Sequence, residues 1–237
     1  MHPILLKFGP FTIYSYGVMV AMGFAVATFL AHKRAARFNI DPGKVIDIAI
    51  ILIAFGILGA RLLYVLLNLS FYIANPIDIV KLSNGGLVWY GGFISAFFAV
   101  IIYVRKAKLN FWAVADLFAP YVALAQAFGR IGCFFNGCCY GKDGIPVQIY
   151  SSIALLIIFI ILRVWQDNKH FAGEIFLGYC VLYSLKRFLM EFLRGDNPAV
   201  FHGLTLSQVI SVFVFFLSSA YLAYKAVQWK KAHSDSR

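Results

Sequence analysis

The sequence predicts an all-α, polytopic integral membrane protein with about seven transmembrane helices. Three observations lead to this prediction. Hydrophobic residues make up 62% of the 237-residue chain and charged residues only 13%, whereas soluble domains are about 45–50% apolar and about 25% charged. Apolar stretches of about 20 residues, the length that crosses a bilayer, recur along the chain, and short basic clusters separate them. This pattern excludes a disordered chain, a small disulfide-rich fold, a soluble enzyme and a nucleic-acid-binding domain.

Seven apolar stretches of spanning length follow one another in the sequence. They lie near residues 12–31, 45–69, 87–104, 111–129, 147–165, 173–193 and 206–224. The fifth and seventh stretches are the clearest, whereas the fourth and sixth carry charged residues. No basic segment precedes the first apolar stretch, which argues against a cleavable signal peptide. We expect residues 1–237 to form one transmembrane domain.

The distribution of basic residues predicts the orientation. Successive loops alternate between the two sides of the membrane, and Lys and Arg are enriched on the cytoplasmic side. One set of alternate loops, with the C-terminal tail, holds 13 basic residues: Lys33, Arg34, Arg37, Lys44, Arg105, Lys106, Lys108, Arg163, Lys169, Lys225, Lys230, Lys231 and Arg237. The other set holds 5: Lys7, Lys81, Arg130, Lys142 and Arg194. We therefore expect the N-terminus outside and the C-terminus in the cytoplasm.

Polar side chains share one helix face in the sixth stretch. The positions i, i+4, i+8 and i+11, which lie on one face of a helix, are occupied by Tyr183, Arg187, Glu191 and Arg194. Charged residues within a span are costly and usually face a protein interior or a water-filled cavity. Two interpretations remain open. One is an internal Arg187–Glu191 ion pair that joins helices, and the other is an anion-binding wall, because guanidinium groups suit phosphate.

The segment 129–144, GRIGCFFNGCCYGKDG, combines four glycines with Arg130 and Asn136. Glycine permits positive φ and a close approach of the backbone to a ligand, and irregular backbone at membrane depth occurs beside protein or a cavity. We expect a re-entrant turn or a broken helix end that lines a site. The alternatives are a plain turn between two spans, and an Arg130 side chain that reaches the membrane surface.

Aromatic residues stand at the start of two stretches. Tyr14 and Tyr16 lie in IYSYG, and Trp89 and Tyr90 lie in NGGLVWYGG. Aromatic side chains at the ends of spans usually form an interfacial belt, although these positions would also suit the wall of the same cavity.

Three of the four cysteines, Cys133, Cys138 and Cys139, form a C-x4-C-C pattern within the glycine-rich segment. This is not a usual zinc-binding spacing, and no pair of histidines lies nearby in the sequence. A disulfide on an oxidising side of the membrane and packing as small apolar residues both fit the pattern. A membrane thiol oxidoreductase and a transporter of organic anions therefore remain alternative functions.

The order of motifs along the chain resembles the family of bacterial prolipoprotein diacylglyceryl transferases. The segment GRIGCFFNGCCYG is similar to the family motif G-R-x-G-N-F-x-N-x-E-x-x-G. Further segments fall in the order of the family: IYSYG, GARLLYV, GGLVWYGGFIS, DLFAPYVALAQAFGR, KRFLMEFLRGDN and LTLSQVIS. These segments cover most of the chain, which makes the resemblance specific.

The resemblance implies a multi-pass enzyme of the bacterial cytoplasmic (inner) membrane, with residues 1–237 as one catalytic domain. Such an enzyme transfers the diacylglyceryl group of phosphatidylglycerol to the thiol of the lipobox cysteine in a prolipoprotein signal peptide. A thioether forms and glycerol 1-phosphate is released. The resemblance implies no metal and no other cofactor. Its partners are the two substrates and the lipid bilayer, not nucleic acid.

The resemblance also assigns roles to residues. Arg187 matches the essential arginine of the sixth span, and Glu191 matches its acidic companion. On this basis we expect Arg187 and Arg130 to clamp the lipid phosphate while Glu191 orients Arg187. The positions that match substrate-binding residues of the family are Arg130, Arg194, Tyr16, Asn136, Gly141 and Tyr183.

Three residues depart from the family pattern. Cys133 stands where the motif has its first Asn, and Cys138 stands where it has Glu. Tyr90 occupies the place where several members carry a His proposed as the base that activates the thiol. Because the thiolate is the nucleophile, a group must accept the proton of the thiol. Tyr90, a water molecule and the lipid phosphate are the candidates.

Overall fold

The computed structural model describes residues 3–8, 11–81, 85–195, 197–201 and 203–234. The predictions that concern Asn84, Asp196 and Arg237 lie outside these residues. The chain divides into two compact units. The first unit comprises Met1–Ala31 and Trp112–Arg237, and the second comprises His32–Phe111.

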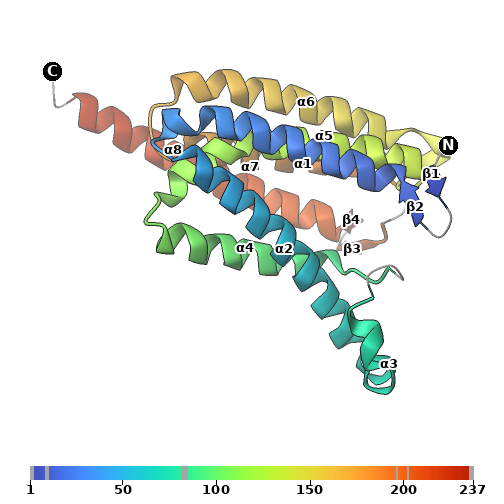
Figure 1. Cartoon of the computed structure of the whole chain (residues 1–237). Coiled ribbons are helices and arrows are strands. Elements are labelled where there is room, and N and C mark those ends of the chain that lie inside the picture. The colour runs from blue at the N-terminus through green and yellow to red at the C-terminus, as the bar shows by residue number, and fades with distance from the viewer. Residues whose placement is uncertain (1–2, 9–10, 82–84, 196, 202, 235–237) are drawn as a thin grey trace. The chain divides into compact units, whose positions relative to one another are not determined.

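Helices make up nearly all of the regular structure (Figure 1). Within the described residues, seven long helices follow the order of the predicted stretches: α1 (Ser15–Arg34), α2 (Pro42–Leu67), α4 (Trp89–Lys106), α5 (Phe111–Asn136), α6 (Val147–Trp165), α7 (Glu174–Glu191) and α8 (Leu206–Ser234). The shorter helices are η1 (Ala35–Phe38), α3 (Leu69–Ala74), η2 (Pro76–Ile79), η4 (Lys142–Gly144) and η5 (Gln166–Asn168). The predicted all-α class is confirmed.

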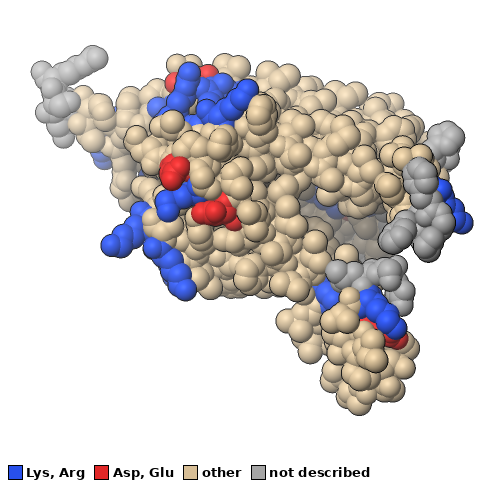
Figure 2. All heavy atoms as spheres, in the orientation of Figure 1, with Lys and Arg blue, Asp and Glu red and all other residues tan. Residues whose placement is uncertain are grey.

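In the described part of the chain, five helical segments are long and apolar enough to cross a membrane: Ser15–Phe38, Pro42–Leu67, Phe111–Asn136, Val147–Asn168 and Leu206–His233. The helices α4 and α7 have 18 residues each, and α7 carries four charged side chains. Large apolar side chains such as Phe213 and Leu58 are more than 60% exposed, and the face seen in Figure 2 is largely uncharged. Lipid solvates such surfaces and water does not. The chain is therefore a multi-pass helical membrane protein.

The first long helix starts later than predicted, because a β-hairpin precedes it. β1 (Ile4–Phe8) and β2 (Phe11–Tyr14) pair antiparallel, and the amide of Ser15 donates to the carbonyl of Pro3 at 3.0 Å. The span predicted near residues 12–31 is thus present, with its start shifted to Ser15. Branched and aromatic residues in both segments favour strands. A second hairpin, β3 (Ala199–Phe201) with β4 (Leu204–Thr205), precedes α8.

The helix α5 is longer than predicted and includes half of the glycine-rich segment. It runs through Gly129 and Gly132 to Asn136, so the helix end that we expect in this segment lies at its middle. A Cβ atom at Gly132 would lie 3.1 Å from Cβ of Met19 and 3.2 Å from the ring of Tyr16. This glycine therefore allows α1 to pack closely on α5. The irregular backbone begins at Gly137, with a φ of 75°.

The core of the first unit lies where α5, α6 and α7 meet. Small residues repeat every four positions on one face of α5 and pack against larger ones: Ala119, Ala123, Ala127, Leu155, Ile158, Leu162 and Ile175. Small residues let helix backbones approach closely, as is typical of membrane helices. The hydroxyl of Ser152 on α6 donates to the carbonyl of Ala127 at 3.0 Å. This core fixes the relative positions of the two helices that carry the arginines, α5 and α7.

Glycines also bring α2 and α4 together in the second unit. A Cβ atom at Gly92 would lie 2.6 Å from the carbonyl oxygen of Gly56. Arg61, 6% exposed, satisfies its guanidinium on main-chain carbonyls that include those of Asp78, at 2.6 Å, and Gly85, at 2.6 Å. Buried charges need such partners. Arg61 therefore binds the segment between α3 and α4, and it has a structural explanation within its own unit.

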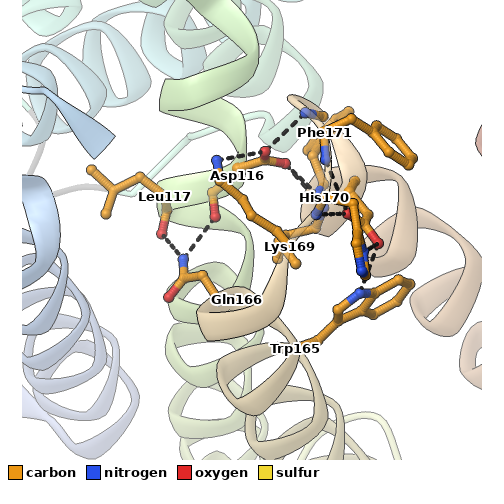
Figure 3. A network of polar contacts seen from close by, with 11 residues as sticks. Asp116, Leu117, Trp165, Gln166, Lys169, His170 and Phe171 are labelled. Carbon is orange, nitrogen blue, oxygen red and sulfur yellow. Dashed lines mark hydrogen bonds and ion pairs between the residues drawn. The ribbon is translucent and has the colours of Figure 1, made fainter. Parts of the chain in front are cut away.

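A buried carboxylate joins α5 to the start of α7 (Figure 3). Asp116, fully buried, accepts hydrogen bonds from the amides of Gly173 at 2.8 Å, Ile175 at 3.0 Å and Phe176 at 3.0 Å. Lys169 Nζ lies 3.3 Å away. The first amides of a helix have no partners within that helix, and a negative charge suits this end of the helix dipole. Asp116 thus satisfies the N-terminus of α7 from a neighbouring helix.

Glu174 forms the second half of this network. Its carboxylate accepts a hydrogen bond from the indole nitrogen of Trp165 at 3.0 Å and others from the amides of His170 and Phe171. The side-chain amide of Gln166 donates to the carbonyl of Asp116 at 2.9 Å. These contacts connect α5, the end of α6 and the start of α7 (Figure 3). Each carboxylate therefore has several donors.

Candidate functional site

The predicted polar face of α7 is present in part. Tyr183, Arg187 and Glu191 lie one turn apart along the helix, and Arg187 Nη1 lies 3.1 Å from Glu191 Oε2. Arg194 does not belong to this face, because α7 ends at Glu191 and the chain turns there. The prediction that all four residues share one helix face is therefore wrong for Arg194.

Glu191, 3% exposed, is held by three groups. Its Oε1 accepts hydrogen bonds from Asn197 Nδ2 at 2.6 Å and from Thr205 Oγ1 at 2.9 Å, and its Oε2 forms the ion pair with Arg187. Arg187 Nη2 in turn donates to Ser207 Oγ at 2.8 Å. The hairpin before α8 and the start of α8 thus fix both members of the pair. These contacts use Nη1 and Nη2 of Arg187, so Glu191 and Ser207 together fix the orientation of its guanidinium.

Arg194 is placed by a backbone bridge to the glycine-rich segment. Gly141 and Arg194 form an antiparallel β-bridge, and the amide of Lys142 donates to the carbonyl of Leu193 at 2.9 Å. A Cβ atom at Gly141 would lie 2.6 Å from the same carbonyl. Only glycine therefore fits at position 141, and its role is to bring the loop after α5 against the chain that follows α7.

Four basic side chains of the first unit lie close enough at this end to repel one another electrostatically. Lys186 interacts electrostatically with Arg130 on α5, with Arg187 on α7 and with Arg194 after it, and Arg187 interacts with Arg130 and Arg194. Glu191 is the carboxylate that pairs with Arg187 within the described residues. We call Arg130, Lys186, Arg187 and Arg194 the cation cluster. Guanidinium and ammonium groups gathered in a partly buried setting can bind an anion.

Lys186 belongs to the cluster, although the helical spacing of Tyr183, Arg187 and Glu191 does not include it. It is 7% exposed, and its ammonium lies 5.4 Å from the centre of the Tyr183 ring. It forms no ion pair with a carboxylate in the described part of the chain. Its charge inside the sixth stretch marked it as unusual, but its position next to Arg187 in the sequence did not predict that it would approach Arg130. That approach depends on how α5 and α7 pack.

Tyr16 lies near the cluster on α1, and Asn136 lies at the end of α5. Tyr16 is the second residue of α1, 44% exposed, and it interacts electrostatically with Arg130. Asn136 is the last residue of α5 and is exposed. An apolar groove of about 530 Å³ runs past this end of the two helices, lined by residues that include Ile4, Val18 and Phe135. A phosphate at the cluster would therefore have an alkyl-binding surface close by.

Tyr90 lies in the second unit, on the first turn of α4, and is 64% exposed. Its ring packs edge-on against Trp89, which stacks on Phe93. The role of Tyr90 as the base stays a prediction.

The three clustered cysteines lie at the end of α5 and in the loop after it. Their sulfur atoms lie within 4.8 Å of one another, and all four cysteines of the chain are free thiols. Burial raises the pKa of the Cys139 thiol, although Arg194 and Arg130 oppose this shift. The side-chain amide of Gln148 fixes the loop by donating to the carbonyl of Cys138 at 2.6 Å. The disulfide that the spacing allowed is absent from the described residues.

A multi-pass helical fold, a cation cluster with an oriented arginine and an adjoining apolar groove define a membrane protein whose polar site has the chemistry to bind an anion. A comparison with known families identifies that class further. Residues 3–224 match the family of prolipoprotein diacylglyceryl transferases. The chain belongs to this family, as the order of its motifs predicted.

Related proteins are similar over almost their whole length. A phosphatidylglycerol–prolipoprotein diacylglyceryl transferase from Clostridium novyi is 37% identical, over 95% of this chain and 96% of the relative. One of the same name from Clostridium tetani is 35% identical, over 92% and 95%. A third, from Listeria monocytogenes, is 32% identical, over 96% and 91%. This chain is therefore related to transferases along its full fold.

Proposed function

We propose that this protein transfers the diacylglyceryl group of phosphatidylglycerol to the lipobox cysteine of prolipoproteins and releases glycerol 1-phosphate. The observation that carries the proposal is the cation cluster around the Arg187–Glu191 pair, 3.1 Å apart, on a chain of this family. Breaking the carbon–oxygen bond of a phosphodiester leaves negative charge on the departing phosphate. Fixed positive charge at that point lowers the barrier most strongly where water is excluded.

The residues take the following roles in this proposal. Arg187 and Arg130 clamp the phosphate from two helices, and Glu191 acts through Arg187 by fixing its orientation. Arg194 and Lys186 add positive charge at the same place. Tyr16, Asn136 and Tyr183 line the entrance for the substrates, and Gly141 holds the loop that closes the site on one side. Tyr90 stays a candidate to accept the proton of the thiol.

The membrane arrangement completes the proposal. All seven long helices span the cytoplasmic membrane of a bacterium, with the N-terminus outside and the C-terminus in the cytoplasm, and residues 1–237 act as one catalytic domain. The excess of Lys and Arg in one set of loops supports this orientation. In this orientation the cation cluster lies on the outer side of the membrane, where a secreted prolipoprotein presents its lipobox.

The test uses the purified full-length protein in detergent with phosphatidylglycerol and a lipobox peptide. Release of glycerol phosphate, together with a diacylglyceryl mass gain on the peptide, is the expected result. Arg187→Ala and Arg130→Ala should each reduce kcat/KM about 10²- to 10³-fold, the usual loss when a group that stabilises the transition state is removed. Arg163→Ala is the matched control, because Arg163 pairs with Asp167 on the exposed surface of α6. Unchanged turnover in folded Arg187→Ala protein would refute the clamp.

A further inference from the structure

Three thiols converge beside the cation cluster, although their order in the sequence does not resemble a common metal site. Cys133 lies on the last turn of α5, and Cys138 and Cys139 lie in the loop that follows. The three sulfur atoms lie within 4.8 Å of one another, and those of Cys138 and Cys139 are 3.5 Å apart. They are partly exposed, so a small solute can reach them.

The backbone of Cys139 brings the two adjacent thiols together. Side chains of neighbouring residues point in opposite directions in an extended chain. Cys139 has a φ of 64°, in the left-handed region that residues with a Cβ atom rarely adopt. The amide of Cys138 donates to the carbonyl of Cys133 at 3.3 Å and closes the turn. The loop therefore holds an uncommon conformation that directs both thiols toward Cys133.

This geometry suits a tetrahedral thiophilic ion. Zinc bonds to thiolate sulfur at about 2.3 Å, which places neighbouring sulfur atoms about 3.8 Å apart. The separation of 3.5 Å between the sulfur atoms of Cys138 and Cys139 lies close to that value, and the other two separations are at most 4.8 Å, so closure around an ion needs movements of about 1 Å or less. Three protein ligands also leave the fourth position of a tetrahedral zinc ion open, as in catalytic rather than structural zinc sites.

The charges around the thiols favour the same ion. Zn²⁺ with three thiolates carries one net negative charge, which a neutral surrounding would oppose. Here Cys139 interacts electrostatically with Arg194 and Arg130, and Cys133 interacts with Arg130. The arginines would stabilise the negatively charged complex. Packing as small apolar residues explains neither the convergence of the thiols nor the left-handed Cys139.

We propose that Cys133, Cys138 and Cys139 bind a Zn²⁺ ion whose open fourth position takes up the acceptor thiol of the prolipoprotein as its thiolate. This inference rests on the proposed function, and it supplies the thiol activation for which Tyr90 was the side-chain candidate. Two of the three ligands, Cys133 and Cys138, are the residues that depart from the family motif.

The step is a substitution without redox change. The acceptor thiol replaces water on the zinc ion and loses its proton to solvent, because a coordinated thiol is deprotonated. The thiolate sulfur forms a bond to the terminal glycerol carbon, and the bond from that carbon to the phosphate oxygen breaks. Its electron pair stays on the phosphate, which the cation cluster holds. The thioether carries no charge, so it leaves the metal and water returns.

Metal content is the first measurement, because it does not depend on activity. The full-length protein, purified with zinc present and then dialysed, should hold one zinc ion per chain. Cobalt in place of zinc should give intense thiolate-to-metal absorption. Cys133→Ser and Cys139→Ser should lower metal affinity at least tenfold. Cys180→Ser is the matched control, because Cys180 lies on α7 outside the thiol cluster. It should keep one ion.

The pH dependence gives a second readout. Zinc binds thiolates and not thiols, so it must displace the protons of the three cysteines on binding. Metal affinity should therefore rise with pH through the neutral range and be lost in acid. Folded wild-type protein that holds less than a tenth of an ion per chain, with three cysteines still reactive toward a thiol reagent, would overturn the site.

Transfer activity then tests the role of the ion. Zinc removed by a chelator should abolish transfer to the lipobox peptide, and added zinc should restore it, without any substitution that endangers folding. Full transfer by zinc-free protein would overturn the activation role. A zinc-loaded protein that fails to transfer would refute the proposed function while the metal site stands, so the two failures are distinguishable.

Discussion

The two ends of the α5–α7 helix pair differ in the charged side chains that they hold. At the start of these helices, Asp116 and Glu174 are buried carboxylates that accept several hydrogen bonds each. At their end, Glu191 is one carboxylate beside the four members of the cation cluster. Arg130 follows Asp116 by 14 residues, about 21 Å along a helix. The same two helices therefore hold one end where buried carboxylates accept hydrogen bonds and one end where basic side chains repel one another.

This difference separates a structural role from a functional one. Backbone amides and neighbouring side chains satisfy the carboxylates at the first end, so nothing further is needed there. In the cation cluster, Lys186 and Arg187 are repelled by the other basic members, and such repulsion is costly in a partly buried setting. An anionic substrate removes that cost on binding. Substitutions at the first end should thus act on stability, and those at the second end on activity.

The largest expected effect is on stability, from Asp116→Ala. The change leaves the buried amides of Gly173, Ile175 and Phe176 without their acceptor, which should cost about 3–5 kcal/mol. A lower melting temperature in detergent would show it. Asp167→Ala is the matched control, since Asp167 pairs with Arg163 at the surface and should cost no more than about 1 kcal/mol. Equal losses in the two variants would contradict the structural role of Asp116.

Glu191→Gln should have the next largest effect, on activity. Glutamine keeps the shape of the side chain but loses the charge that orients Arg187, so kcat/KM should fall about 10- to 100-fold, or about 1.4–2.7 kcal/mol in the barrier. Glu174→Gln, on the first turn of α7, should lower the melting temperature and leave the turnover of folded protein unchanged. A loss of turnover in Glu174→Gln as large as that in Glu191→Gln would contradict the assignment of a structural role to the first end and a functional role to the second.

Lys186→Met should weaken substrate binding by a smaller amount. Methionine keeps most of the buried volume and removes one charge from the cluster, so KM for phosphatidylglycerol should rise about tenfold, or about 1.4 kcal/mol. Lys186→Arg should restore most of the affinity because it retains the charge. A KM unchanged in Lys186→Met, measured in mixed micelles, would exclude Lys186 from the anion site.

The smallest expected effect comes from Trp165→Phe. The change keeps the aromatic ring and removes one donor from Glu174, at 3.0 Å. Because Glu174 retains its hydrogen bonds from the amides of His170 and Phe171, the loss should be about 1 kcal/mol. Thermal unfolding in detergent measures it. A loss as large as that of Asp116→Ala would show that the indole, and not the set of donors, holds this network together.

The sequence by itself determined the class of protein, its motifs and one contact of the site. Apolar stretches of spanning length predict helices in a membrane because lipid offers no partners for backbone amides. The order of motifs predicted the family to which the chain belongs. The spacing of Arg187 and Glu191 predicted their ion pair, since residues four apart are neighbours on any helix.

Only the tertiary structure decided which distant residues meet. Arg194 leaves the predicted helix face because α7 ends at Glu191, and the bridge to Gly141 places it instead. Lys186 approaches Arg130 through the packing of α5 and α7. The thiols converge because α5 continues to Asn136 and Cys139 adopts a left-handed conformation. Helical periodicity reaches only a turn or two along the chain, whereas these contacts depend on where helices end and how their small residues pack.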